Sequence, residues 1–183
     1  MTLSKEKQKT AYETLSKAFG YATYMATPRI SKITVSVGTG KRKDVKQVAF
    51  IAKRLADITG QHPATRPAKQ SIASFKVREG DPVGLIVTMH GERMYNFLDK
   101  LIHIALPRTR DFRGIPLSSI DAMGNITIGI REHTIFPEAA NEDLKDVFGM
   151  AITITTTAKT RQEAEAFLRH LGLPLRVDAS TKS

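Results

Sequence analysis

The sequence contains no cysteine and no tryptophan among its 183 residues. Without cysteine the chain can form no disulfide bond, no thiolate zinc site and no thiol nucleophile. Long hydrophobic runs are absent as well, since Val83–Val87 is among the longest and a membrane-spanning helix needs roughly 20 apolar residues. The N-terminus scatters lysines among polar residues without an apolar core, so we expect no signal peptide. These absences predict a cytoplasmic protein with no membrane partner.

Acidic residues are too few to balance the basic ones. The chain has 28 Lys and Arg against 18 Asp and Glu, which gives a formal net charge of +10. Such an excess attracts polyanions. With 41% hydrophobic and 25% charged residues, the chain has the composition of a globular protein rather than a disordered one. The composition therefore favours a globular protein that binds nucleic acid.

Residues with the spacing of a catalytic or metal site are missing. The segment Gly38–Arg42 suggests a phosphate-binding loop, but Val35 stands where the pattern needs glycine and Arg42 where it needs serine or threonine. The five histidines are dispersed and lack metal-ligand spacing, and we expect His103, within an apolar helix, to be structural. An acid–base cluster can be imagined from three residues whose spacing fits no known mechanism: Glu132, His133 and Glu138. We predict no catalytic residue, no metal and no cofactor.

Hydrophobic periodicity predicts helices and strands in alternation. Helical spacing marks residues 4–19, 44–60, 94–107 and 160–172, and strands are expected at 33–37, 62–67, 83–90, 125–130 and 150–157, with an irregular excursion at 131–149. After the N-terminal helix, the first six elements match a split βαβ, ferredoxin-like core. We therefore predict an α+β fold with a largely antiparallel sheet, helices packed on one face, an N-terminal helix and extended basic loops. We expect one domain, residues 1–183, with frayed ends at 1–10 and 176–183.

The uncovered face of this sheet would carry hydroxyl side chains. The residues concerned are Thr34, Ser36, Thr127, Thr153, Thr155 and Thr157. Hydroxyls beside basic loops can bind RNA phosphates and 2′-OH groups. Threonine is also common in strands for packing reasons alone, and without further observations that interpretation is the stronger one. Because the strands carry no aromatic platforms, backbone and shape recognition are favoured over base stacking.

Two segments concentrate the positive charge. The first is an exposed basic loop, residues 68–82, which with the preceding strand contributes Arg66, Lys69, Ser71, Lys76 and Arg78. The second runs from Pro107 to Gly114 and contains Arg108, Arg110 and Arg113. Arginine suits bidentate phosphate contact, whereas lysine acts as a point charge. One such loop alone would be read as solvated surface, but two on a chain of charge +10 favour RNA contact.

Eight motifs in order resemble the bacterial large-subunit ribosomal protein five family, over roughly residues 11–177. They are Pro28–Thr34, Thr59–Pro63, Phe75–Gly80, Gly91–Met94, Pro107–Gly114, Gly129–Glu132, Ile135–Glu138 and Ile152–Lys159. The resemblance implies a structural protein of the large subunit that binds 5S rRNA and helps attach it to 23S rRNA in the central protuberance. It also implies contacts with P-site tRNA, with neighbouring 5S rRNA-binding ribosomal proteins and, across an intersubunit bridge, with small-subunit protein thirteen.

The resemblance also assigns expected roles to individual residues. The 5S rRNA contact would involve Arg29, Lys32, Thr34, Ser36, Gln61 and Thr88. The loop with Arg66, Lys69, Ser71, Lys76 and Arg78 would approach tRNA or rRNA, and an rRNA or bridge surface would include Arg108, Arg110, Arg113 and Arg131.

The chain departs from the family pattern at three positions. Ser36 stands where asparagine is usual, and Gln70 and His90 replace basic residues. At position 36 a single hydroxyl then replaces an amide that can both donate and accept. At positions 70 and 90 the loss of positive charge should weaken local phosphate contacts. The alternatives to the ribosomal role are an RNA-modifying enzyme and a free-standing basic RNA-binding protein.

Overall fold

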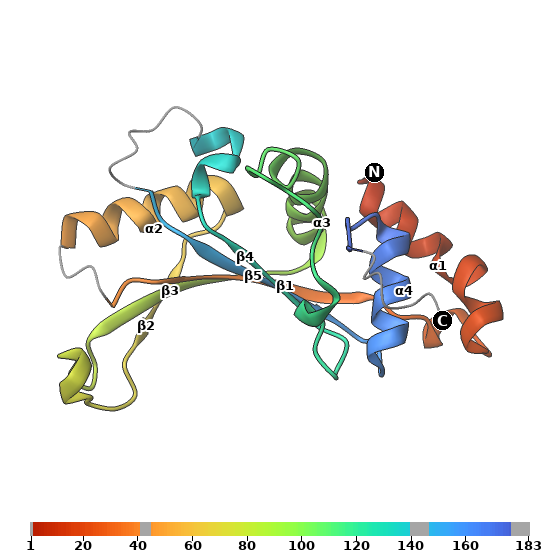
Figure 1. Ribbon diagram of the computed structural model, residues 1–183, viewed down its shortest axis with the longest axis horizontal. Helices are drawn as coiled ribbons and strands as arrows, with labels where there is room; N and C mark the ends of the chain where they lie inside the picture. Colours follow the sequence, from red (N-terminus) through yellow and green to blue (C-terminus); the bar gives the residue numbers. More distant parts are fainter. Residues whose placement is uncertain (1, 41–44, 140–146, 177–183) are drawn as a thin grey trace. The chain divides into compact units, whose positions relative to one another are not determined.

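The computed structural model describes residues 2–40, 45–139 and 147–176, and the chain has an α+β fold with a five-stranded antiparallel sheet (Figure 1). The strands are β1 (Ile30–Gly38), β2 (Ala64–Pro67), β3 (Pro82–Met89), β4 (Ile126–Ile130) and β5 (Met150–Thr156). The α-helices among the described residues are α1 (Leu3–Phe19), α2 (Val45–Thr59), α3 (Gly91–Lys100) and α4 (Arg161–Leu171). The predicted fold class is confirmed.

The strand order in the sheet is β2-β3-β1-β5-β4. β3 lies between β1 and β2, which is the predicted split βαβ arrangement, and β2, which contains Pro67, is an edge strand as predicted. One detail differs from a ferredoxin-like order, because β5 rather than β4 lies beside β1. β5 has seven residues and β4 has five. Short strands are suited to sheet edges, so the longer one takes the inner place.

The described chain divides into two compact units. Unit 1 comprises residues up to Ile33, His90–Ile128 and residues from Thr153, and unit 2 comprises Thr34–Met89 and Gly129–Ile152. The boundaries fall within β1, β4 and β5. The single domain expected from the sequence stays a prediction.

In unit 1, helix α1 packs against both α4 and α3 (Figure 1). Ser4 is buried, and both its backbone N–H and its hydroxyl donate to the Asp99 carboxylate of α3. Lys7 donates from Nζ to the carbonyl of Leu171 over 3.2 Å. These contacts hold residues 3–10 in a packed helix, which differs from the frayed N-terminus expected from the sequence. Of the tail expected to fray, only Arg176 lies within the described residues.

Helix α4 begins with the predicted capping box. The Thr160 hydroxyl accepts a hydrogen bond from the N–H of Glu163 at 3.3 Å. In return the Glu163 carboxylate accepts from the N–H of Lys159 at 2.7 Å, one residue before the N-cap. The same carboxylate also accepts from the Tyr21 hydroxyl. The box therefore ties the segment after α1 to the start of α4.

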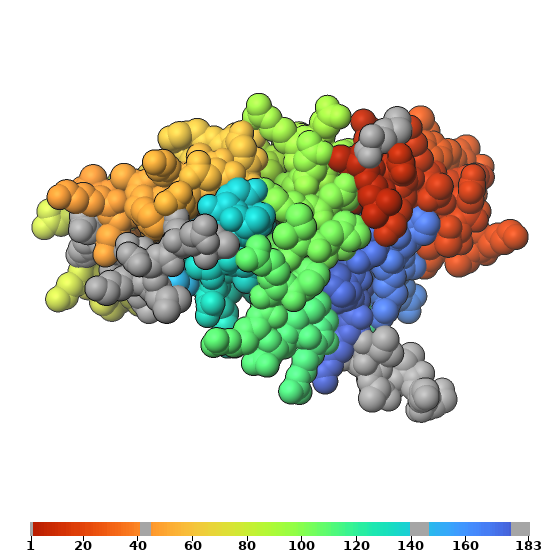
Figure 2. All heavy atoms as spheres, turned by 90° about the horizontal axis from the view of Figure 1, so that it is seen from above, coloured from red at the N-terminus to blue at the C-terminus, as the bar shows by residue number. Residues whose placement is uncertain are grey.

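In unit 2, helix α2 packs on β3 and on the 3-10 turn Pro137–Ala139. Figure 2 shows this turn, in cyan, beside the helix. Ile51, Leu55 and Ile58 form its buried stripe. The predicted N-cap of this helix, Asp44, lies outside the described residues. The predicted excursion at 131–149 contains short 3-10 turns where it is described.

Helix α3 continues into a π-helical turn at Leu101–Ala105. The prediction that His103 is structural is wrong, because its side chain is exposed. His103 lies seven residues, or about two turns, after the exposed Asn96 and so shares its outer face. His133 is the completely buried histidine instead. Its ring stacks on Phe148 with centroids 4.0 Å apart, and its Nδ1 accepts from the Phe148 N–H.

Candidate nucleic-acid interface

The residues expected to contact 5S rRNA divide between the two units. Arg29 and Lys32 belong to unit 1, where both side chains are exposed. The other four belong to unit 2 and are half-buried: Thr34, Ser36, Gln61 and Thr88. None of the six is part of the apolar core.

Within unit 2 the fold brings Gln61 and Thr88 together. The Gln61 side-chain amide donates to the backbone carbonyl of Thr88 at 3.2 Å, across 27 residues of sequence. Gln61 is positioned by the end of α2, where the Thr59 hydroxyl accepts from the Gln61 N–H and donates to the Leu55 carbonyl at 2.6 Å. The amide is therefore fixed against β3 by a chain of hydrogen bonds, which limits the entropy that it would lose on binding.

Alternate positions along the strands leave a partly exposed row of hydroxyls. On β1, Val35 and Val37 are buried while Thr34 and Ser36 are half-buried. In unit 1 the hydroxyls of Thr127 and Thr153 are 3.1 Å apart and share a hydrogen bond. Five of the six predicted hydroxyls are thus at least partly exposed on strands: Thr34, Ser36, Thr127, Thr153 and Thr155. Thr157 is different, because β5 ends at Thr156 and the Thr157 hydroxyl accepts from the backbone N–H of Arg29.

The first basic loop is a structured hairpin extension. Its ends are joined by hydrogen bonds from Ala68 N to Asp81 O at 2.8 Å and from Gly80 N to Ala68 O at 3.0 Å. The Ser71 hydroxyl accepts from the Glu79 N–H, and the Asp81 carboxylate accepts from the Arg78 N–H. All five predicted contact residues of this region are exposed: Arg66, Lys69, Ser71, Lys76 and Arg78. The loop therefore presents its charges from a defined backbone.

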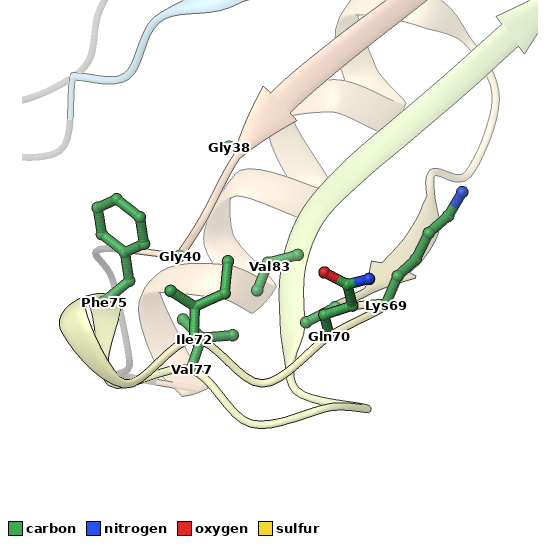
Figure 3. A pocket seen from close by; sticks show the side chains of 9 residues that line it. Gly38, Gly40, Lys69, Gln70, Ile72, Phe75, Val77 and Val83 are labelled. Atoms are coloured by element: carbon green, nitrogen blue, oxygen red, sulfur yellow. The ribbon is translucent and has the colours of Figure 1, made fainter.

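The same loop has an apolar side that the sequence analysis missed. Phe75 is 72% exposed and Ile72 is 44% exposed. With Val77 and Val83 they surround a groove of about 910 Å³ whose opposite wall includes Gly38 and Gly40 of unit 2 (Figure 3). The apolar residues at 72, 75 and 77 were a signal, but the interpretation of this loop rested on its charges alone.

The second basic loop belongs to unit 1. Arg108, Arg110 and Arg113 are exposed. Between them Asp111 has a φ of 54°, and in the first loop Lys76 has a φ of 53°. They are the positive-φ residues other than glycine within the described ranges. Backbone of this kind is costly for a residue with a side chain and recurs at functional sites.

Arg131 is exposed as well but lies in unit 2, so the predicted bridge residues are not gathered within one unit.

At the three departures from the family pattern, the side chains remain near solvent. His90 is exposed and its Nδ1 lies 3.2 Å from the carbonyl of Ser31 in unit 1. Gln70 is exposed on the first basic loop, and Ser36 is half-buried on β1.

The described part of the chain holds no group of three or more histidine and acidic side chains that could bind a metal ion. Within that part, no helix is long and apolar enough to span a bilayer. His133, one member of the imagined acid–base cluster, is buried against Phe148 as described above, which is a packing role.

A basic α+β protein with hydroxyl-lined strands and two basic loops is, by class, an RNA-binding protein. Two family models match the chain: one for ribosomal protein L5 over residues 24–78, and one for the C-terminus of the same ribosomal protein family over residues 82–175. Among curated relatives, large ribosomal subunit protein uL5 of Halothermothrix orenii is 47% identical over 87% of this chain and 90% of its own length. The same protein of Microcystis aeruginosa is 46% identical over 93% of this chain and 99% of its own length. That of Geobacter sulfurreducens is 46% identical over 90% and 92%, respectively.

This chain belongs to the ribosomal protein L5 family. Its role is therefore that of a structural component of the large ribosomal subunit rather than of an enzyme, and it works in the cytoplasm as part of the ribosome. The predicted family is confirmed.

Proposed function

We propose that this chain binds 5S rRNA and helps attach it to 23S rRNA in the central protuberance of the large subunit. The observation that carries the proposal is the hydrogen bond from the Gln61 amide to the Thr88 carbonyl. The family resemblance assigns both residues to the 5S rRNA contact, and the fold joins them although they are distant in sequence. The Gln61 side-chain amide and the Thr88 hydroxyl then belong to one half-buried patch of unit 2. Such a polar patch suits contact with the sugar and phosphate groups of RNA.

In unit 2, Thr34 and Ser36 of β1 contribute further hydroxyls to the proposed 5S rRNA contact. In unit 1, Arg29 and Lys32 contribute exposed charges to it. The hydroxyls supply hydrogen bonds that can distinguish RNA through its 2′-OH groups, and the two charges supply phosphate neutralisation.

The loop that carries Arg66, Lys69, Ser71, Lys76 and Arg78 approaches P-site tRNA. Its exposed charges support this role, as does its hydrogen-bonded base, since a loop with a defined backbone can reach a mobile ligand without a large ordering cost.

Arg108, Arg110 and Arg113 of unit 1 and Arg131 of unit 2 contact rRNA or form the intersubunit bridge to small-subunit protein thirteen. The exposure of all four arginines supports that role. Other 5S rRNA-binding ribosomal proteins adjoin the same RNA.

Variants at Gln61, Thr88 and Arg78 test whether 5S rRNA and tRNA bind to separate surfaces of the protein. Gln61→Ala and Thr88→Ala are each expected to weaken 5S rRNA binding by about 1 kcal/mol or more, because their RNA partners would be left unpaired. Arg78→Ala is expected to change 5S rRNA binding little, because its loop contacts tRNA. Binding titrations of the purified proteins with 5S rRNA measure all three.

Thr88→Ser is the matched control, since it keeps the hydroxyl and leaves the carbonyl that pairs with Gln61 in place. It is expected to bind like the wild type. Equal losses for the Gln61, Thr88 and Arg78 variants would refute the assignment of separate surfaces to 5S rRNA and tRNA.

A further inference from the structure

The apolar groove of unit 2, beside the first basic loop, is part of a larger apolar surface. A second hollow of about 300 Å³ adjoins the groove, because Val77 and Val83 line both. At the two ends of this surface Phe75 is 72% exposed and Val45 is 80% exposed. Its apolar side chains are Val45, Val48, Ile72, Phe75, Val77 and Val83. An exposed apolar patch with a polar rim marks a site where a partner binds.

Two glycines leave the floor of the groove bare (Figure 3). Gly38 is the last residue of β1, Gly40 follows it, and neither has a positive φ. A Cβ added at Gly38 would meet nothing within 4 Å, and one at Gly40 would come no closer than 3.9 Å to Val83. Neither backbone conformation nor packing within the described chain therefore requires glycine here. Glycine in a strand often marks a place where a ligand or another backbone approaches closely.

The lining of the groove suits aliphatic side chains better than a nucleobase. Ile72, Val77 and Val83 are aliphatic, and Phe75 supplies the aromatic ring among the described lining residues. A nucleobase stacks on flat faces and needs hydrogen bonds for its polar edges, and a polar edge buried without partners is costly. Aliphatic side chains carry no polar edge. The groove thus fits a protein segment that inserts apolar side chains, as an amphipathic helix does.

The charges around the groove indicate an acidic partner. Residues 66–81 carry four cations against two acids, Glu79 and Asp81. Lys69 belongs to the lining of the groove itself. One of the acids is already engaged, because the Asp81 carboxylate accepts a hydrogen bond from the Arg78 N–H at 2.8 Å. Carboxylates that flank the apolar side chains of a partner would therefore meet a complementary potential.

We propose that this apolar surface docks an acidic, amphipathic segment of a partner protein. The apolar side chains of the segment fill the groove beside Phe75 and the hollow beside Val45, and its backbone passes over Gly38. Its carboxylates pair with the cations of the rim, Lys69 among them. The proposal goes beyond the RNA contacts proposed above, because its occupant is a protein that binds the apolar side of the hairpin.

Peptides selected from a random phage-displayed library on the full-length protein test the chemistry of the occupant. Peptides of roughly 12 residues are long enough for about three helical turns, and selection at about 200 mM salt weakens binding by charge alone. We expect the enriched sequences to combine Asp or Glu with Leu, Ile or Phe at helical spacing. Enrichment of acidic residues without apolar ones, or no enrichment at all, would overturn the proposal.

Gly38→Leu tests the place of binding, because it fills the groove from a position without backbone strain. The variant should melt like the wild type, yet it should bind the enriched peptides at least roughly tenfold more weakly. Gly129→Leu is the matched control. Gly129 is also a strand glycine whose added Cβ meets nothing within 4 Å, and it does not line the groove. It should bind the peptides like the wild type.

The exposed ring of Phe75 provides a second pair of variants. Phe75→Ala should lower peptide affinity roughly tenfold, since a large apolar anchor is removed from the interface. Met123→Ala should leave it unchanged, although Met123 is equally exposed at 72% and apolar. Both side chains are exposed, so neither substitution should change the melting temperature.

Titration of the same variants with tRNA separates a protein site from an RNA site. We expect Gly38→Leu to lose peptide binding and to retain tRNA binding. If Gly38→Leu and Phe75→Ala instead weaken tRNA binding and leave peptide binding intact, the groove is an RNA contact and the docking proposal is wrong. Equal peptide affinities for Gly38→Leu and Gly129→Leu would overturn it as well.

Discussion

At the scale of single residues, Tyr21 shows how one hydroxyl connects two parts of unit 1. It donates to the Glu163 carboxylate, which also completes the capping box of α4. Burial raises the pKa of Tyr21 above its ordinary value of 10.0, and the hydrogen bond to Glu163 and the charge of that carboxylate raise it further. The neutral phenol is thus the form that the fold requires.

The raised pKa of Tyr21 predicts a loss of stability at high pH. Because the folded-state pKa exceeds the unfolded one, the stabilisation is complete below pH 10 and decreases as the pH rises through the folded-state pKa. Tyr21→Phe should lower the free energy of unfolding by about 1 kcal/mol at neutral pH, a value reduced because the side chain is partly exposed. Urea titrations of both proteins between pH 7 and pH 11.5 measure the difference.

The difference between wild type and Tyr21→Phe should shrink above pH 10, since the wild type alone loses this contribution. A difference that stays constant over that range, or grows, would contradict the role assigned to the neutral Tyr21 hydroxyl.

At the scale of elements, the turn Asp121–Asn125 sets the start of β4. Gly124 adopts a φ of +78°, and its carbonyl accepts from the buried Thr156 hydroxyl at 2.7 Å. Asn125 donates its N–H to the Asp121 carboxylate at 2.7 Å and accepts from the Thr156 N–H through its side chain. The hydrogen bonds from the Asn125 side chain and backbone lower the pKa of Asp121. This turn therefore joins β4 to the end of β5.

Gly124→Ala should destabilise the protein. A Cβ at Gly124 would lie 2.9 Å from the Cβ of Ala158 and 3.1 Å from its carbonyl oxygen, in addition to the cost of a positive φ. We expect a loss of about 2 kcal/mol or more in the free energy of unfolding, visible as a lowered melting temperature.

Gly129→Ala is the control for that substitution. Gly129 lies in β4, where an added Cβ meets nothing within 4 Å and φ is not positive. It should have the stability of the wild type or slightly more, because alanine reduces the entropy of the unfolded chain. Equal melting temperatures for the two variants would show that the close approach at Gly124 does not constrain the turn.

The elements themselves could be predicted well from the sequence because their signals are local. Alternation of Ile126 and Ile128 or of Ile152 and Ile154 gives a strand, and Thr160 with Glu163 gives a helix start, whatever the rest of the chain does. The order of β4 and β5 could not be predicted, because both alternate equally and their places depend on pairing with distant strands.

The candidate site was predictable only in part for the same reason. The basic loops are visible as composition, and the resemblance supplied Gln61 and Thr88, but no local pattern reveals that these two residues are hydrogen-bonded. Phe75 was missed because a loop rich in charge conceals an apolar groove.

At the scale of the whole molecule, the net charge of +10 and the family membership agree on an RNA-binding role in the ribosome. Charge alone would make any polyanion a ligand, and that part of the affinity decreases steeply with salt. Preference for one RNA requires fixed hydrogen-bonding groups, such as the Gln61 amide held against Thr88. The two contributions can therefore be separated by changing salt and RNA together.

The most direct test of the proposed role is a titration of the purified full-length protein with 5S rRNA at about 50 and about 200 mM salt, beside an unrelated structured RNA of equal length. We predict that both affinities fall by orders of magnitude with salt if several phosphates are neutralised. The preference for 5S rRNA should nevertheless persist at the higher concentration. Equal affinity for the two RNAs at both salt concentrations would contradict specific 5S rRNA binding and leave only a basic surface that attracts RNA.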